Sequence, residues 1–452
     1  MKNLTLNNIA SAVGGTLLGA RSNDDREVTM VTLDSRKIEE GGLFIATVGE
    51  KTDGHNYIKD VADKGAMAVI CEKKVEDCKI PRIMVKDSFQ ALKDLAAFYR
   101  SNLDIPVVGI TGSVGKTSTK EFIATVLGTR FNVLKTQGNF NNEVGMPLTV
   151  LSIRDEHEIA VIEMGISDFG EMTRLSAISR PDTCVITNIG QCHLENLRDR
   201  DGVLKAKTEM LANLNPEGKI FLNGDDDKLI TVKDKREPIF FGLGKNNEIR
   251  AEEIENKGLL GSVFTCVYKD ERFRINVPLP GKHMVMNALA AAGVGFSYGL
   301  TSEDIAKGIA LLKPTDGRSN VISTGRFTLI DDCYNANPVS MKAAIDLLAQ
   351  ADTRKVAILG DMFELGKNEN ELHYGVGEHL RDSNIDVLIT VGNLSKNIFN
   401  AVKETKEAYS FDTMDEALNN IPSILKKDDS VLIKASHGMH FENILNSLKE
   451  GK

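Results

Sequence analysis

The chain has 452 residues, 42% of them hydrophobic and 26% charged, which provides apolar material for the cores of about two to four domains. Its net charge of −9, without any basic run, disfavours a nucleic-acid-binding protein. No stretch approaches the roughly 20 consecutive apolar residues that cross a bilayer, and the N-terminus lacks the pattern of a signal peptide. We expect a cytoplasmic, monomeric protein that neither binds nucleic acid nor inserts into membranes. Its six scattered cysteines form no CxxC pair, so we expect reduced thiols.

The first 86 residues predict a small α/β domain. Apolar runs indicate strands at residues 43–49, 66–72 and 83–85, and residues 56–65 indicate a short helix. No repeat or linker-like segment marks the end of this domain, so its boundary is placed where the rhythm of strands and helices changes.

Residues 87–314 predict a larger domain with a parallel sheet. A helix at residues 89–99 leads into the almost wholly apolar run 105–111, which is typical of a strand covered by helices on both faces. A glycine-rich turn and an amphipathic helix follow, and further apolar strands are expected at residues 159–165 and 183–188.

Residues 315–452 predict a second doubly wound, Rossmann-like sheet. Buried strands are expected at residues 326–332, 355–361, 386–392 and 430–436, each ending in polar residues. Pro338 suits the first turn of the helix that separates the first two. In such sheets ligands bind at the carboxyl ends of the strands. We therefore expect an α/β protein of three domains.

The turn between the strand at 105–111 and its helix has the composition of a phosphate-binding loop. Gly112 and Gly115 would allow backbone amides to approach phosphates, Lys116 would pair with phosphate oxygens, and the Thr117 hydroxyl would bind Mg²⁺. The longer GxxxxGK[ST] pattern is missed because Ile110 occupies its first glycine position. An ordinary glycine-rich turn is the alternative, which the lysine–threonine pair disfavours. The predicted ATP-binding residues here are Gly112, Ser113, Val114, Gly115, Lys116, Thr117 and Ser118.

Three further side chains follow or lie near these strands. Glu163, at the end of a buried strand, suits Mg²⁺, although a solvated or capping glutamate is the alternative. His193 follows the next strand, where a structural histidine is the alternative to a metal ligand. Lys207, taken alone, would be a solvated helix lysine. His437 and His440 lack the partners of a zinc motif, so we treat them as non-metal residues.

Taken in order, these motifs resemble the Mur ligases, which build the peptide stem of bacterial peptidoglycan. The resemblance covers essentially the whole chain. It is carried by LDSRKIEEGGLFIATVGEKTDGH, GNFNNEVGMPLTVL, TNIGQCHLE, DDCYNANPVSMKAAI and LGDMFELG. These stretches are most similar to the family member that adds D-alanyl-D-alanine to UDP-N-acetylmuramoyl-tripeptide. The DNPR tetrapeptide of the member that adds the third stem residue is absent.

The resemblance implies an ATP-dependent ligase that forms an acyl phosphate, with two Mg²⁺ ions. It implies that Lys116, His193 and Lys207 are catalytic, and that Lys207 carries CO₂ as a carbamate. The implied metal ligands are Thr117, Glu163, His193 and Lys207. ATP would also contact Asn287, Arg318 and Asp332. The implied substrate-binding residues are Ser35, Arg36, Asp53 and His55 in the UDP-sugar pocket, with Asn139, Asn141, Asn142, Tyr334, Asn335 and Asn337 elsewhere.

Some positions depart from the family pattern. Gln191 and Cys192 replace the more usual pair before His193, Thr208 replaces a glycine after Lys207, and SHGMH stands where arginines are more common. The alternatives are a ligase of the same family or a folylpolyglutamate synthase that adds a single amino acid, a nucleotide-hydrolysing switch, and a nucleotide-binding protein without catalysis. The sequence does not identify the third stem residue.

Overall fold

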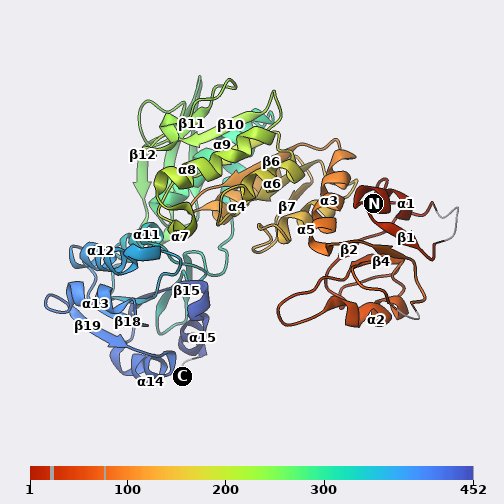
Figure 1. The fold of residues 1–452 in the computed structure, drawn as a ribbon. Helices are drawn as coiled ribbons and strands as arrows, with labels where there is room; N and C mark the ends of the chain where they lie inside the picture. The colour runs from red at the N-terminus through yellow and green to blue at the C-terminus, as the bar shows by residue number, and fades with distance from the viewer. Residues whose placement is uncertain (21–24, 76–77, 451–452) are drawn as a thin grey trace.

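The computed structural model of the protein describes residues 1–20, 25–75 and 78–450. These residues form three sheets, of five, nine and six strands, that follow one another along the chain. In Figure 1 the N-terminal part, in red and orange, and the C-terminal part, in blue, adjoin different sides of the central part. The predicted α/β fold with three domains is confirmed, while the exact boundaries after residues 86 and 314 stay a prediction.

The N-terminal sheet has the strand order β1-β5-β4-β3-β2, with only β1 antiparallel to its neighbour. Alternate residues of its inner strands enter two different cores: Leu43 and Ile45 face one, and Phe44 and Ala46 the other. Its elements are α1 (Leu6–Ala12), β1 (Thr16–Leu18), β2 (Val31–Thr32), β3 (Leu43–Ile45), the 3-10 helix η1 (Gly54–Tyr57), α2 (Ile58–Asp63), β4 (Ala68–Cys71) and β5 (Arg82–Met84).

The central sheet has the strand order β14-β13-β12-β11-β10-β9-β6-β8-β7. Its strands are β6 (Val107–Thr111), β7 (Val133–Lys135), β8 (Ile159–Glu163), β9 (Thr183–Ile186), β10 (Lys219–Asn223), β11 (Ile239–Gly242), β12 (Ile249–Asn256), β13 (Ser262–Tyr268) and β14 (Glu271–Val277). β6 to β12 are parallel, whereas β13 and β14 are antiparallel additions. The sequence predicted β6, β8 and β9 of this sheet and none of the others.

Helices cover both faces of this sheet. They are α3 (Ser88–Ser101), α4 (Lys116–Leu127), α5 (Gly145–Leu151), α6 (Glu171–Ser179), α7 (Leu194–Leu197), α8 (Arg200–Thr208), α9 (Lys282–Ser297) and α10 (Ser302–Ala310). Val107 of β6 packs with α3 and α6, and the next residue, Val108, packs with α4 and α9. β6 pairs with both β8 and β9, so the strand order reverses at β6. A ligand site is expected at the carboxyl end of such a strand.

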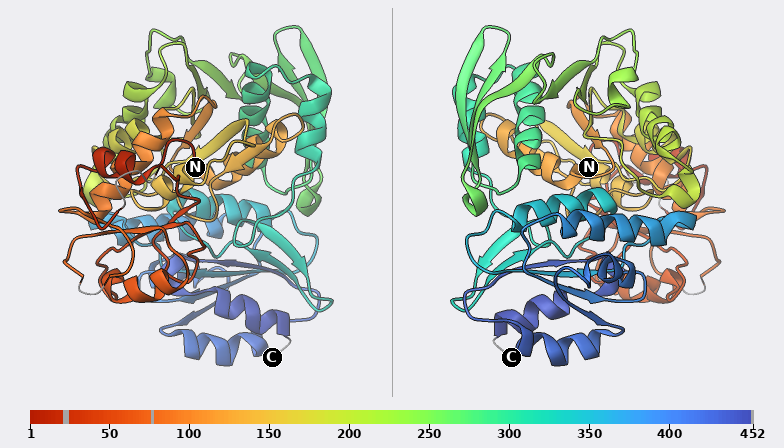
Figure 2. Two further views of the ribbon diagram at one scale, coloured as in Figure 1. Left: turned by 90° about the vertical axis from the view of Figure 1, so that its right-hand side faces the viewer. Right: turned by 90° about the vertical axis from the view of Figure 1, so that its left-hand side faces the viewer.

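The C-terminal sheet has the strand order β15-β16-β20-β17-β18-β19, parallel except for β15. Figure 2 shows helices on both faces of this sheet, which is coloured blue. Its elements are β15 (Asn320–Ser323), β16 (Thr328–Asp331), α11 (Pro338–Leu348), β17 (Lys355–Gly360), α12 (Glu369–Arg381), β18 (Val387–Val391), α13 (Lys396–Val402), β19 (Glu407–Phe411), α14 (Met414–Ile424), β20 (Ser430–Lys434) and α15 (Glu442–Glu450). Pro338 opens α11, as predicted, and Asn337 caps it. No helix in the described ranges is long and apolar enough to cross a membrane.

Candidate active site

The glycine-rich turn lies between β6 and α4, as the sequence predicts. Gly112 has a φ of +152°, and a Cβ there would lie 1.9 Å from the Thr187 hydroxyl oxygen, so only glycine fits. Gly115, with a φ of +80°, is the N-cap of α4. Ile110 occupies the missed glycine position because it is still a buried residue of β6, and the turn begins only after it.

Lys116 and Thr117 open α4 and face the turn. The Lys116 ammonium donates a hydrogen bond to the Gly112 carbonyl oxygen at 2.9 Å. Burial lowers the pKa of Lys116, although the carboxylate of Glu163 opposes this shift. The Thr117 hydroxyl accepts a hydrogen bond from Arg318 at 3.2 Å. A partly buried ammonium with one carbonyl partner at a helix N-terminus would be stabilised by an anionic phosphate.

The loop after β9 holds the glycine-rich turn in place. Asn188 forms two hydrogen bonds with the backbone of Val114: its Oδ1 accepts from the N–H at 3.0 Å, and its Nδ2 donates to the carbonyl oxygen at 3.1 Å. The Thr187 hydroxyl donates to the same carbonyl at 2.6 Å. The conformation of the turn is therefore fixed by a neighbouring strand end, without any ligand.

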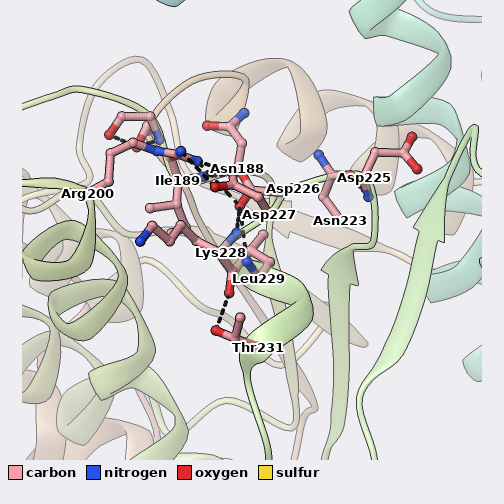
Figure 3. A network of polar contacts seen from close by, with 12 residues as sticks. Asn188, Ile189, Arg200, Asn223, Asp225, Asp226, Asp227, Lys228, Leu229 and Thr231 are labelled. Carbon is pink, nitrogen blue, oxygen red and sulfur yellow. Dashed lines mark hydrogen bonds and ion pairs between the residues drawn. The ribbon is translucent and has the colours of Figure 1, made fainter.

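A second polar network fixes the same loop from its other side (Figure 3). The Asp226 carboxylate accepts a hydrogen bond from the Ile189 N–H at 2.8 Å, and Arg200 donates to the Ile189 carbonyl at 2.9 Å. Arg200 also pairs with Asp227 at 2.5 Å. Because both backbone groups of Ile189 are bound by side chains, the segment that leads to His193 starts from a fixed point.

Glu163 ends β8 and is 1% exposed. Its Oε1 accepts a hydrogen bond from Asn141 at 2.7 Å, whereas its buried Oε2 has no hydrogen-bond partner. Asn141 lies against Gly165, where a Cβ would be 3.0 Å from the amide carbon. A buried carboxylate oxygen without a partner is unfavourable, and a cation would remove that cost. The arrangement thus fits the predicted role of Glu163 as a Mg²⁺ ligand.

His193 and Lys207 lie on the segment beyond this loop. Nδ1 of His193 is 2.7 Å from Oε2 of Glu364, a residue of the C-terminal domain, and this contact lowers the pKa of Glu364. Lys207 lies in α8 and is 1% exposed. Burial lowers the pKa of Lys207 to about 8. Within the described chain, no hydrogen bond or ion pair holds its ammonium.

The C-terminal domain contributes a further set of polar and charged side chains to the site. The Arg318 guanidinium lies over the Tyr334 ring, with its Cζ 3.9 Å from the ring centroid. Asp332 pairs with the buried Lys434 at 2.6 Å and accepts a hydrogen bond from the Ser319 N–H at 2.9 Å. Both acid and lysine are therefore neutralised by each other, and Arg318 remains directed at Thr117.

One cavity of about 540 Å³ collects these groups from the central and C-terminal domains. Of the predicted site residues, it is lined by Ser113, Val114, Gly115, Lys116, Thr117, Ser118, Asn141, Asn142, Glu163, His193, Asn287, Arg318, Asp332, Tyr334, Asn335 and Asn337. Gly112, Asn139 and Lys207 do not line it. Asn287 accepts a hydrogen bond from Thr119 at 3.0 Å, and its predicted contact with adenine stays a prediction.

The four residues of the predicted sugar pocket lie in the N-terminal domain, outside this cavity: Ser35, Arg36, Asp53 and His55. Asp53 and His55 do meet, with Nδ1 of His55 2.6 Å from the Asp53 carboxylate. Lys73 also pairs with Asp53 at 2.5 Å. Arg36 is instead exposed and binds the neighbouring Asp34. The sugar pocket therefore stays a prediction.

Several residues of the site were missed by the sequence analysis. Asn188 carried a signal, because it is a polar residue directly at a strand end inside TNIGQCHLE. Lys434 carried another, since a lysine within an apolar strand requires a partner. Glu364 lies within LGDMFELG, but nothing in that stretch indicates its partner, and Asp226 had no local signal, because the partners of both come from distant segments.

A metal ion would need ligands besides acids and histidines. In the described part of the chain, no three or more His, Cys, Asp or Glu side chains are grouped to hold one. Glu163 and His193 would have to be completed by the Thr117 hydroxyl, a modified Lys207, nucleotide oxygens or water.

Comparison with known proteins gives a family match over most of the chain. Profiles described as "Mur ligase family, catalytic domain", "Mur ligase middle domain" and "Mur ligase, glutamate ligase domain" match residues 27–100, 110–295 and 317–437. The UDP-N-acetylmuramoyl-tripeptide--D-alanyl-D-alanine ligase of Bacillus subtilis (strain 168) is 38% identical over 457 residues, which cover 99% of this chain and 98% of that protein.

Solved structures give a concordant result. MurF from Acinetobacter baumannii superposes with a TM-score of 0.91 and 32% identity, covering 99% of both chains. MurF ligase from Thermotoga maritima, solved in complex with ADP, gives a TM-score of 0.82 and 28% identity over 93% of this chain and 97% of that one.

Proposed function

Because the chain belongs to the Mur ligase family, we propose that it joins D-alanyl-D-alanine to UDP-N-acetylmuramoyl-tripeptide with hydrolysis of ATP to ADP and phosphate. The observation that carries this proposal is the single cavity in which the glycine-rich turn, Glu163 and Arg318 meet. The name of the Bacillus subtilis relative supports addition of a dipeptide rather than of one amino acid. The enzyme is a ligase that forms a C–N bond.

The chemistry has two steps. The terminal carboxylate of the tripeptide attacks the γ-phosphorus of ATP, so that ADP leaves and an acyl phosphate forms. The dipeptide amine then attacks the acyl carbon, and phosphate leaves from the tetrahedral intermediate as the amide forms. Lys116 would leave the Gly112 carbonyl and bind the β- and γ-phosphate oxygens, which offsets the charge that repels the attacking carboxylate.

The residues around Glu163 fit a divalent cation. Two Mg²⁺ ions would neutralise phosphate charge there: the proposed ligands are Thr117 and Glu163 for one ion, and His193 and a carbamate on Lys207 for the other. Glu163 is the ligand best supported, because its Oε2 is buried without a partner. Asn141 would orient Glu163 through its hydrogen bond to Oε1.

Lys207 fits this role only after modification. At about 4 Å and an effective dielectric near 20, one pair of unit charges is worth on the order of 4 kcal/mol, so an ammonium beside Mg²⁺ would be repelled by roughly 8 kcal/mol. The lowered pKa of about 8 supports carbamate formation, because the neutral amine is the form that adds CO₂, releasing one proton. The N–C bond so formed would turn a cation into an anion.

Closure of the C-terminal domain would shield the acyl phosphate from water. Arg318 already reaches Thr117 across the domain boundary, and Tyr334 stacks on that guanidinium. We propose that Asn335 and Asn337 line the space for the dipeptide, and that the chain acts as a cytoplasmic monomer.

Product analysis tests the proposal. UDP-N-acetylmuramoyl-tripeptide, ATP, Mg²⁺ and D-alanyl-D-alanine should yield the pentapeptide product, one ADP and one phosphate. Free D-alanine, L-glutamate and other single amino acids should release far less phosphate. A preference for one of these would replace the proposal with single-residue addition, and ATP hydrolysis unaffected by both substrates would indicate a nucleotide switch. Nucleotide binding without turnover would indicate a protein without catalysis.

A further inference from the structure

His193 and Glu364 meet across the boundary between the central and C-terminal domains. Nδ1 of His193 lies 2.7 Å from Oε2 of Glu364, and the two residues lie on either side of the domain boundary predicted after residue 314. His193 lines the cavity that contains the glycine-rich turn, whereas Glu364 does not. No interaction in the described chain occupies Nε2 of His193, so that nitrogen is free for a ligand.

The loop that carries Glu364 is held rigidly within its own domain. The N–H of Met362 donates to Nε2 of the buried His373 at 2.8 Å. The N–H of Phe363 donates to the hydroxyl of Ser436 at 2.9 Å, and Ser436 is 3% exposed. Glu364 therefore follows two backbone groups that are fixed by the core of the C-terminal sheet.

Both partners have a left-handed backbone conformation. The φ angle is +51° at His193 and +61° at Glu364, and neither residue is a glycine. Such conformations cost of the order of 1 kcal/mol or more and persist where the surroundings require them. The facing elements are also close, because a Cβ at Gly366 would lie 3.5 Å from the backbone nitrogen of Glu195 in α7.

We propose that Glu364 is a positioning residue for His193. Its carboxylate would accept a hydrogen bond from Nδ1–H of the neutral imidazole and so leave Nε2 free for a divalent cation in the cavity. The inference rests on the proposed function, in which His193 is a Mg²⁺ ligand. Since Glu364 belongs to the C-terminal domain, the cation site would be complete only when that domain lies against the central one. Cation binding and domain closure would thus favour each other.

An exposed ion pair without a role is the simplest alternative. The side chains are 27% and 62% exposed, and pairs of this kind contribute little to stability. A pair without a role could be removed with no effect on cation affinity. Metal binding measured directly therefore distinguishes the two.

The experiment measures Mn²⁺ affinity by electron paramagnetic resonance, with ADP present, for the wild-type protein and three variants. Glu364→Ala should raise the dissociation constant of Mn²⁺ at the site that contains His193 by about 10- to 100-fold. Glu364→Gln keeps a side-chain oxygen that can accept a hydrogen bond from Nδ1–H, so its Mn²⁺ affinity should lie between those of Glu364→Ala and the wild type. Glu371→Ala removes an exposed carboxylate of the same domain and should match wild type. Small-angle scattering should show Mn²⁺-dependent compaction in wild type and less of it in Glu364→Ala.

Wild-type Mn²⁺ affinity in Glu364→Ala would overturn the inference while leaving the proposed function intact. A lower melting temperature with unchanged Mn²⁺ affinity would overturn it too, because it would show a purely structural contact. Absence of nucleotide-dependent Mn²⁺ binding in the wild-type protein would overturn both this inference and the proposed metal site.

Discussion

The two halves of the cavity are built differently. On the central side, the backbone of Val114 alone forms three hydrogen bonds with the side chains of Thr187 and Asn188, and Ile189 is held at both of its backbone groups. On the C-terminal side, the cavity is completed by contacts across the boundary, such as Arg318 to Thr117 and Glu364 to His193. The nucleotide-binding half is therefore preformed, whereas the other half depends on domain position.

The largest effect is expected from removing the ammonium of the preformed half. Lys116→Ala should lower kcat by about 10³-fold or more, because no other side chain at the turn offers a cation to the transferred phosphoryl group. Lys205→Ala is the control, since Lys205 is an exposed lysine of α8. For both variants, phosphate release measures kcat and calorimetry measures the affinity for ADP. Activity near wild type in Lys116→Ala would contradict the assigned phosphate site.

A smaller effect, on stability, is expected from Lys207. Its pKa is about 8 in the folded protein against an ordinary value of 10.5, so between these pH values the unfolded chain binds more protons than the folded one. Stability should therefore rise with pH across this window, by about 3 kcal/mol in total, relative to Lys207→Met. Urea unfolding of both proteins in CO₂-free buffers between pH 7.5 and 10.5 measures the difference.

The same unfolding measurements can be repeated in buffers that contain CO₂. Carbamate formation should reduce the pH dependence of the wild-type protein, because the modified side chain no longer titrates as an amine. If the free energy of unfolding changed with pH in the same way for wild type and Lys207→Met, that result would contradict a buried, unmodified Lys207. Activity of Lys207→Ala that is lost and then partly restored by a short carboxylic acid would support the metal-ligand role.

The sequence predicted the preformed half better than the other half. The glycine-rich turn, Lys116 and Glu163 were accessible because each lies at the end of an apolar strand, and parallel strand ends share one edge of a sheet. The antiparallel strand β14 was missed, since polar and apolar residues alternate along it and leave it less apolar than a buried parallel strand. The contact of Glu364 with His193 could not be predicted, although Glu364 lies in LGDMFELG, because it depends on how two domains are placed, which no local pattern encodes.

A third prediction concerns the amide that holds the turn. Asn188→Ala should raise the dissociation constant of ADP by about 10-fold, because it leaves the Val114 N–H without its partner, at a cost of roughly 1–3 kcal/mol. Asn188→Asp can accept from that N–H but cannot donate to the carbonyl oxygen, so it should not restore full affinity. Asn246→Ala, an exposed site, is the control. Wild-type affinity in both Asn188 variants would show that the turn holds its shape alone.

The smallest effect on nucleotide affinity is expected from the C-terminal side. Arg318→Ala removes one 3.2 Å hydrogen bond to Thr117, and the net value of such a bond is about 1 kcal/mol, so the ADP dissociation constant should rise by no more than about 5-fold. Turnover should fall further than ADP affinity, because Arg318 would act when the domains close on ATP and the tripeptide. Calorimetry with ADP and steady-state kinetics separate these quantities. A loss of ADP affinity as large as that in Lys116→Ala would mean that the nucleotide is held equally by both domains, and that the central half is not preformed.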